Sequence, residues 1–463
     1  MRTSPFRLLA AGTLAALVLT GQGCGGPSAA QQQAAAPVTL TVWRVFEGED
    51  TLRQIMSDYQ LLHPNVSFQY RQLRVEEYRD ELLRAFAEGR GPDIFSVHNT
   101  WIGEHQPLMS PLPPSLTIPY TETRGTIRRE TTHTLRTEST ITPAQVRNQF
   151  LDVVAADVIR PYQATPDAAA VPRIWGLPLA VDTMALFYNR DLLNAANIPQ
   201  PPATWQQFQD AVSPPRLTTV GPDDLIVQSG AAIGTARNVE RAFDLLSVIM
   251  MQNGTPMVAD NGRAAFASAN EARQVPGAQA LQFYTDFANP TKITYAWNDQ
   301  QPPSFEAFVN GQTAFFFGYS YHIPLLRARN PRLRIGIAPL PQIGDGRAVN
   351  YANYWVETVA RASANQHWAW DFIQFAARPE NVTSYLTTTR KPPALKSLIT
   401  PALLEHEDLG VFTNQLLTSQ SWYRGRNASV AERAFLDMID AVNAGSPLEQ
   451  ELGRAQTMVN QTL

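Results

Sequence analysis

The sequence of 463 residues is poor in cysteine and has almost no excess of one charge. Its single cysteine, Cys24, excludes an intramolecular disulfide framework and any metal or redox site built from several thiolates. The 37 basic and 41 acidic residues give a net charge of −4, so the chain lacks the basic excess that attracts a phosphate backbone. Nucleic acid is therefore not expected as a main partner.

Common enzyme motifs are also missing from the sequence. HExxH, the P-loop and GxSxG do not occur, and the 7 histidines are scattered without the spacing of metal ligands. We therefore expect no catalytic residue, no cofactor and no metal site. The chain is instead rich in apolar residues (44%), and its 9 Trp, 14 Tyr and 21 Phe supply many aromatic rings. This composition is typical of a folded protein with a sizeable core.

The N-terminus has the pattern of an export signal. Arg2 and Arg7 precede an apolar run, Leu8–Thr20, that is about 20 Å long at about 1.5 Å per residue, too short for a bilayer core of about 30 Å. The segment LTGQGC, which ends at Cys24, is similar to a bacterial lipobox, although Gly21 stands where that pattern usually has Leu. We predict a signal peptide at 1–24 and lipidation of Cys24. The alternative is an ordinary secretory signal with an incidental cysteine.

Residues 25–37 are small and polar and are predicted to be a flexible tether. From Val38 onward, alternating apolar residues predict strands at 38–43, 66–73 and 92–97, and helical periodicity predicts helices between them. This order favours right-handed βαβ units and a parallel sheet. Further along, we expect an extended run at 176–189, largely helical sequence to about 310, and then strands at 313–318 and 333–338 with helices after them.

A threonine-rich segment interrupts this pattern. Residues 121–142 hold nine Thr with scattered Arg and Glu and few apolar residues, which predicts a surface insertion at about 115–142. The segment could form two Thr-rich strands that turn near Gly125. A mobile loop is the expectation that the composition favours.

Several segments, in order, resemble the extracellular solute-binding proteins of ABC importers, in the sugar-binding group related to maltose-binding protein. They are LTVWRVFEG (40–48), GPDIFSVHNTWIGEH (91–105), WGLPLAVDTMALFYNRDLLNAANIPQPPATWQQF (175–208), FEAFVNGQTAFFFGYSYHIPLL (305–326), RIGIAPLPQ (334–342) and RPENVTSYLTTTRKPPALKSL (378–398). Together they cover most of residues 38–400.

The resemblance implies an α/β, two-lobe periplasmic-binding-protein fold, type II-like, with interlobe hinge strands and a ligand cleft. It places residues 38–181 and 319–350 in the N-terminal lobe, and residues 182–318 and 351–463 in the C-terminal lobe. The crossings between the lobes are expected near 178–184, 316–320 and 348–355. In open α/β sheets, ligands bind beyond the carboxyl ends of strands, so the loops there are the candidate site.

A neutral sugar stacks its C–H faces on aromatic rings and pairs its hydroxyls with polar groups, so we looked for that mixture in the loops after the expected strands. The candidate ligand-binding residues are Phe46, Glu47, Asn99, Trp101, Asp182, Trp297, Asp299, Tyr319, Tyr321, Asn353, Tyr354, Trp355 and Arg390. Some have other readings: Asp182 could brace the hinge by capping backbone groups, and Arg390 could pair with a surface carboxylate. The resembling family often has Trp where Tyr319 or Tyr321 stands.

The sequence therefore predicts a monomeric, lipid-anchored binding protein on the outer face of the cytoplasmic membrane, or in the periplasm, that passes a saccharide to an ABC permease. Three alternatives stay open. The same fold could bind a phosphorylated polyol through Arg44 and Arg390, or it could serve as a sensor or adhesin. An exported carbohydrate-active enzyme would need paired carboxylates, for which Asp182 and Glu47 are candidates.

Overall fold

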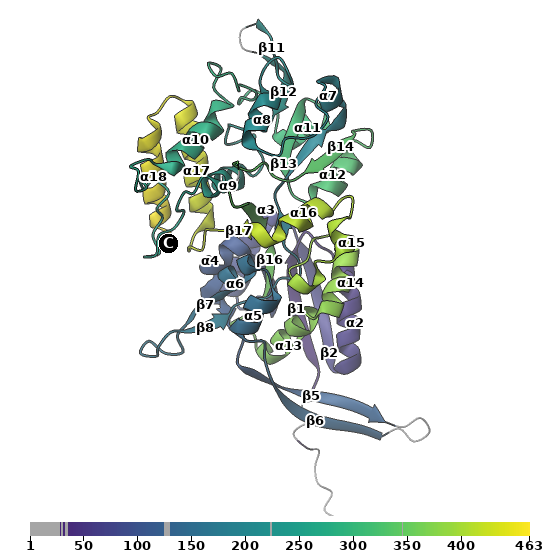
Figure 1. Cartoon of the computed structure of the whole chain (residues 1–463). Helices are drawn as coiled ribbons and strands as arrows, with labels where there is room; N and C mark the ends of the chain where they lie inside the picture. Colours follow the sequence, from purple (N-terminus) through teal and green to yellow (C-terminus); the bar gives the residue numbers. More distant parts are fainter. Residues whose placement is uncertain (1–27, 29–30, 33–35, 125–129, 223–224, 345) are drawn as a thin grey trace, which may run out of the picture.

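The computed structural model describes residues 28, 31–32, 36–124, 130–222, 225–344 and 346–463 (Figure 1). The predicted signal peptide with Cys24 lies outside these residues, as does most of the predicted tether. No helix in the described part of the chain is long and apolar enough to cross a membrane.

The first of two five-stranded sheets uses the strands that alternation predicts near the N-terminus. Its order is β2-β1-β3-β16-β4, with β1 parallel to β2 and β3, and β16 antiparallel to β3 and β4. The carboxyl ends of β1 and β3 therefore lie at the same end of the sheet as the beginning of β16. The strands are β1 (Val38–Val45), β2 (Val66–Leu73), β3 (Ile94–His98), β16 (Trp355–Ala360) and β4 (Met109–Ser110).

Helices cover this sheet and bury their apolar faces against it (Figure 1). In α2, for example, Ile55, Met56 and Tyr59 recur at helical spacing and are all buried. The helices of this lobe are α2 (Arg53–Leu62), α3 (Val75–Ala87), α4 (Ile102–His105), α5 (Pro143–Gln149), α6 (Asp152–Val158), α13 (Gln366–Ala376) and α14 (Pro379–Thr389).

The second sheet forms the other lobe and has the order β11-β12-β13-β10-β14. Strand β12 runs parallel to β13, and β10 is antiparallel to β13 and β14. The strands are β11 (Thr219–Val220), β12 (Ile226–Ala231), β13 (Thr313–Gly318), β10 (Ala185–Asn189) and β14 (Ile335–Ala338). The expected strand at 313–318 is confirmed, whereas β12 lies in sequence that was expected to be largely helical.

The second lobe is richer in helices than the first (Figure 1). Its helices are α7 (Arg190–Ala195), α8 (Trp205–Val212), α9 (Ala242–Gln252), α10 (Pro276–Asp286), α11 (Ser304–Val309), α12 (His322–Arg329), α17 (Ala428–Asn443) and α18 (Leu448–Asn460), and two short helices, α15 (Pro401–Leu404) and α16 (Gly410–Gln415), precede α17 in the chain. Helix α9 is apolar on nearly every side because α10, α17 and the strand β15 (Asn350–Asn353) surround it.

A three-stranded sheet joins the lobes, in the order β17-β15-β9. Its strands are β9 (Asp182–Thr183), β15 (Asn350–Asn353) and β17 (Ser419–Gln420). The expected crossings near 178–184 and 348–355 coincide with β9 and β15. The crossing expected at 316–320 is wrong, because β13 pairs with β10 and β12 inside the second sheet. The third crossing is at β17 instead.

The buried side chains assign the chain to lobes differently from the expected boundaries. Residues 319–350 were expected in the N-terminal lobe, but Tyr319, Leu340 and Val349 belong to the core that includes β10, β12 and β13. Residues from Ala352 to Leu395 were expected in the C-terminal lobe but pack into the core of β1 and β3. The physical reason is that the chain changes core at β15 and changes back between α16 and β17: Phe412 packs with Phe187 of β10, Leu416 still packs in the first core, and Trp422 lies in the second.

The threonine-rich segment forms a hairpin, not the mobile loop that its composition favoured. Strands β5 (Ser115–Arg124) and β6 (Glu130–Ser139) pair in antiparallel register over ten residue pairs, and the hairpin projects from the first lobe (Figure 1). Leu116 and Ile118 alternate toward the lobe and are buried, which anchors the base of the hairpin. A second hairpin, β7 (Ile159–Tyr162) and β8 (Val171–Ile174), belongs to the same lobe.

Candidate functional site

Three chain segments converge at one end of the first sheet and carry aromatic side chains there. Phe46 follows β1, Trp101 lies in the short turn after β3, and Trp355 begins β16, where it is paired with His98. Because β16 runs antiparallel to β3, a residue at its beginning reaches the same end of the sheet as the residues that follow β1 and β3. The sheet topology therefore brings together rings that are far apart in sequence.

These rings contact one another and form what we call the aromatic cluster: Phe46, His98, Trp101 and Trp355. Trp355 is at the centre, with ring centroids 6.2 Å from Phe46, 5.3 Å from Trp101 and 5.3 Å from His98, all at steep interplanar angles. Phe46 is 57% exposed, so the cluster offers an accessible apolar face. Edge-to-face contacts of this kind hold rings in fixed orientations.

His98 is held in a neutral form by its surroundings. Its Nε2 lies 3.2 Å from Asn353 Oδ1, and its Nδ1 lies 2.8 Å from Thr100 Oγ1. Burial, with a smaller effect of the Arg241 charge, lowers the pKa of His98 to about 3. The aromatic cluster therefore carries no charge near neutral pH.

Below the cluster, Glu47 is fully engaged by the first lobe. It forms an ion pair with Arg44 (2.8 Å) and another with Lys391, and it accepts a hydrogen bond from the Tyr385 hydroxyl (2.8 Å). Burial opposes ionisation, but Arg44 and Lys391 outweigh it and lower the pKa of Glu47 to about 2. These contacts fix the turn in which Phe46 adopts a left-handed backbone (φ 65°), a strained conformation for a residue with a large side chain.

The second lobe contributes a hydrogen-bonded set that we call the arginine–tyrosine group: Arg241, Asp244, Tyr319 and Tyr321. Arg241 Nη2 lies 2.6 Å from Asp244 Oδ2, and the Tyr319 hydroxyl donates to the same oxygen at 2.6 Å. The ring of Tyr321 stacks on that of Tyr319, with centroids 5.9 Å apart, and is 38% exposed. Arg241 precedes α9 with a left-handed backbone (φ 62°), and its side chain is 30% exposed.

The aromatic cluster and the arginine–tyrosine group lie close to each other at the boundary of the lobes. The charge of Arg241 acts on His98, and Trp101 packs against the cores of both lobes. Asp182 ties the hinge strand β9 to the loop that carries the two tyrosines, because it accepts hydrogen bonds from Ser320 N (2.9 Å) and Ser320 Oγ (2.7 Å). Burial raises the pKa of Asp182 to about 6. These contacts favour the hinge-bracing role for Asp182.

The structure places several candidate residues away from this boundary set. Asn99 and Tyr354 are buried beside Asp157, whose carboxylate accepts a hydrogen bond from the Tyr354 hydroxyl (2.7 Å). Trp297 is buried in the core of the second lobe, and Asp299 is exposed.

Arg390 is also elsewhere. It caps α14 with a left-handed backbone, is exposed, and its charge acts on Asp408. Of the candidates, the structure thus brings together Phe46, Trp101, Asn353 and Trp355 on one side and Tyr319 and Tyr321 on the other, with Asp182 at the hinge.

Three residues of the set were not singled out from the sequence: His98 as a ring of the cluster, Arg241 and Asp244. His98 had a usable signal, because it directly follows the strand predicted at 92–97 and directly precedes the candidate Asn99. Arg241 and Asp244 had none, since they stand at the start of an apolar helix that was assigned no site.

The chemistry of this set suits binding. Apolar ring faces lie next to charged and hydroxyl groups that donate and accept hydrogen bonds, which is the combination that an amphipathic polyhydroxylated ligand requires. Among the described residues, no group of three or more His, Cys, Asp or Glu side chains is placed to hold a metal ion.

Comparisons with known proteins also indicate a binding protein. A family model described as bacterial extracellular solute-binding protein matches residues 54–408. The galactooligosaccharide-binding protein of Bacillus subtilis (strain 168) is 21% identical over 407 residues, which cover 87% of this chain and 84% of that protein.

Two solved structures share the fold, each at 18% identity over 92% of this chain. The sugar-binding protein MalE from Xanthomonas citri has a TM-score of 0.68 and 97% of its chain covered. The cyclic α-maltosyl-1,6-maltose binding protein from Arthrobacter globiformis has 0.67 and 99%. The predicted two-lobe α/β fold is confirmed.

Proposed function

This chain belongs to the family of bacterial extracellular solute-binding proteins, and from that premise we propose that it captures a sugar or oligosaccharide between its two lobes and delivers it to the permease of an ABC importer. The similar proteins from Bacillus subtilis and Arthrobacter globiformis are named for binding galactooligosaccharides and a cyclic maltosyl-maltose. Those names support a saccharide as the ligand of this chain.

One observation carries the proposal: an exposed aromatic face from the first lobe lies beside a charged, hydroxyl-bearing face from the second lobe. The ring of Phe46 (57% exposed) with Trp355 and Trp101 would stack on the C–H face of a pyranose. Arg241 and the hydroxyl of Tyr321 would donate to its hydroxyls. Such a ligand gains contacts from both lobes at once, so its binding favours the arrangement in which the lobes approach each other.

The contacts of four charged residues argue against two alternatives. Two cations were proposed for a phosphorylated polyol. Arg44 is only 4% exposed and is paired with Glu357 and Glu47, and Arg390 caps α14 away from the boundary set. Glu47 and Asp182, the carboxylates proposed for an enzyme, are both occupied by protein groups. We therefore favour a neutral ligand that is bound and released unchanged.

The proposal includes export and a lipid anchor at Cys24. The support is the apolar segment Leu8–Thr20 followed by the sole cysteine of the chain. A thioether-linked diacylglycerol on Cys24 would hold the protein at the outer face of the cytoplasmic membrane, where a permease lies within reach of the tether. Mass spectrometry of the protein purified from its membrane fraction tests this: acylated Cys24 at the N-terminus supports the anchor, and a free thiol there contradicts it. The same material, run on a sizing column, tests the proposed monomer.

Ligand identity is tested by calorimetric titration of the purified protein with three sets of compounds: mono- and disaccharides, galacto- and malto-oligosaccharides, and sugar phosphates. We expect a neutral saccharide to bind with a Kd in the micromolar range or tighter. We expect that no sugar phosphate displaces this saccharide. Binding of only the phosphorylated compounds would overturn the neutral-ligand proposal. Release of shorter sugars from a bound oligosaccharide would overturn the assignment as a binding protein.

A further inference from the structure

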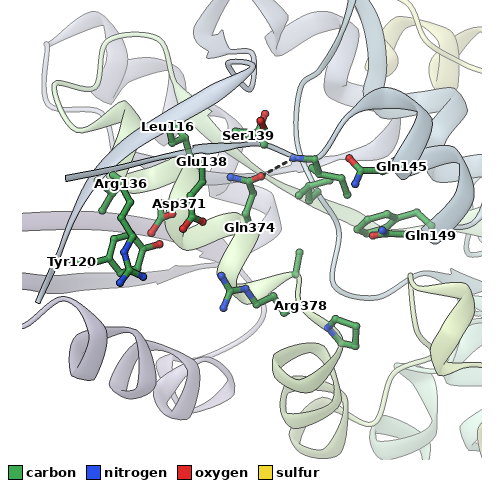
Figure 2. Close-up of a pocket in the computed structure, with 17 residues that line it drawn as sticks. Leu116, Tyr120, Arg136, Glu138, Ser139, Gln145, Gln149, Asp371, Gln374 and Arg378 are labelled. Atoms are coloured by element: carbon green, nitrogen blue, oxygen red, sulfur yellow. Dashed lines mark hydrogen bonds between the residues drawn. The ribbon is translucent and has the colours of Figure 1, made fainter. Parts of the chain in front are cut away.

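A cavity lies beneath the β5–β6 hairpin of the first lobe (Figure 2). It has a volume of about 300 Å³, is open to solvent on one side, and is lined by the hairpin, by α5 and by α13. Leu116 and Ile118 of the hairpin and Phe150 and Leu177 of the lobe give it an apolar floor. An adjoining cavity of about 320 Å³ shares its charged residues and extends toward His63 at the end of α2.

Charged groups of both signs line this cavity from different elements. Arg136 and Glu138 come from β6, Asp371 from α13 and Arg378 from the residue just before α14. The Arg136 guanidinium lies over the Tyr120 ring, 4.6 Å from its centroid. Figure 2 shows the Glu138 and Asp371 carboxylates near each other, with the Arg378 guanidinium below them. Electrostatics agree with this placement: burial raises the pKa of Asp371 to about 6, Arg378 lowers it and Glu138 raises it.

Two of these groups have unused hydrogen-bonding capacity. Asp371 is held by the Tyr59 hydroxyl at 2.8 Å. Within the part of the chain that the structure describes, Glu138 and Arg378 form no ion pair or hydrogen bond through their charged ends, and they are too far apart to pair with each other. Gln374 uses its Oε1 to accept from Ile141 N (3.0 Å), which leaves its NH₂ group facing the cavity (Figure 2).

We propose that this cavity binds a small zwitterionic molecule of the α-amino acid class. A ligand ammonium would lie against Glu138 and Asp371, a ligand carboxylate would accept from Arg378 and the Gln374 amide, and an apolar side chain would rest on the floor of Leu116 and Phe150. A molecule with one charge would leave the opposite groups unpaired, whereas a zwitterion satisfies both ends. The volume suits a molecule of this size, since small-molecule sites begin at about 300 Å³.

The cavity is separate from the boundary between the lobes. Its residues belong to the first lobe and its hairpin, and none of them belongs to the aromatic cluster or to the arginine–tyrosine group. The inference therefore does not depend on the saccharide proposal, and either can fail without the other.

The test is calorimetric titration of the full mature protein with the twenty common amino acids. Leucine, 3-methylbutylamine and 4-methylpentanoate form a matched set that removes first the carboxylate and then the amine. We expect at least one amino acid to bind, and we expect each singly charged analogue of that ligand to bind at least tenfold more weakly. Absence of binding by every amino acid at 10 mM, or equal binding by a singly charged analogue, would overturn the proposal.

Variants locate the binding. Glu138→Gln and Arg378→Gln change exposed residues and should each weaken amino acid binding at least tenfold while saccharide binding is unchanged. Glu76→Gln and Arg147→Gln, which alter the same charges on exposed helix positions outside the cavity, should leave both unchanged. Circular dichroism confirms folding of each variant. Amino acid binding that survives both cavity variants would place the site elsewhere and contradict the inference.

Discussion

The two lobes bring different chemistry to their boundary. The first lobe presents rings fixed by edge-to-face contacts, and its one ionisable ring, His98, is held neutral. The second lobe presents an ion pair, Arg241 with Asp244, and tyrosines stacked beside it. One face can stack on almost any pyranose, whereas the other must match the positions of hydroxyls. The difference suggests that the first lobe supplies affinity and the second lobe supplies selectivity.

The largest expected effect is on the stacking face. Trp355→Ala removes the ring at the centre of the aromatic cluster and should weaken saccharide binding by about 2–3 kcal/mol, or about 30–150-fold, as expected for a central aromatic in a binding site. Calorimetric titration with the best saccharide measures it. Trp368→Ala, which removes a half-buried Trp packed on His63 in the same lobe, is the control and should leave the affinity unchanged. Equal losses of saccharide affinity in both variants would contradict the claim that the aromatic cluster contacts the sugar.

A second prediction concerns the neutrality of the first lobe. His98 has a folded pKa of about 3, below its ordinary value of about 6.5, so the unfolded chain binds the extra proton between these pH values. The contribution of His98 to stability is therefore full above about pH 6.5 and is lost as pH falls through that window, by about 2 kcal/mol at pH 5.

His98→Gln should flatten this acid limb, because glutamine does not titrate. Urea unfolding of both proteins between pH 4 and pH 8 measures the difference. If the free energy of unfolding depends on pH in the same way in wild type and variant, His98 titrates at its ordinary pKa. The aromatic face of the first lobe would then gain a charge as pH falls through that value.

The selectivity of the second lobe is tested by Arg241→Lys. The substitution keeps the charge beside Asp244 but removes the planar fork of the guanidinium, and it should weaken the preferred saccharide about tenfold. Affinity for epimers of that sugar should fall less, so the ratio between the affinities for the preferred sugar and for its epimers should become smaller. Arg237→Lys, which alters an exposed arginine paired with Asp440 four residues earlier, is the matched control. A uniform loss for all sugars would give Arg241 a role in affinity and not in selectivity.

The smallest expected effect separates stability from binding at one residue. Phe46→Gly removes a ring that is 57% exposed from a left-handed backbone position. Glycine adopts this conformation without strain, so the free energy of unfolding should stay level or rise by up to about 1 kcal/mol. Saccharide affinity should nonetheless fall about threefold to tenfold. A variant that is less stable by more than 1 kcal/mol would mean that the Phe46 ring supports the fold.

Much of the fold could be predicted because its elements follow local patterns. Strand β2 and strand β13 begin and end where alternation and apolar runs place them. The lobe boundaries could not be derived in this way. They depend on short hinge strands, above all β17 (Ser419–Gln420), which has only two residues and no periodicity to detect. Strand β12 was missed because it lies between helices.

The site was partly predictable for a similar reason. Phe46, Trp101 and Trp355 stand at strand ends, so sheet topology brings them together. Trp297 also stands in a loop, but its ring is buried and its Nε1 donates to Asn238, a contact that sequence does not reveal. Arg241 reaches the boundary only because α9 packs among α10, α17 and β15. This tertiary packing leaves no local pattern in the sequence.

The central claim is that one saccharide contacts both lobes at their boundary. Hydrogen–deuterium exchange of the protein with and without its best saccharide tests it most directly. We expect slower exchange in two separate regions, one in residues 94–101 and 353–357 of the first lobe and the other in residues 240–246 and 319–322 of the second. Protection confined to one lobe, or protection only around the β5–β6 hairpin, would contradict the account.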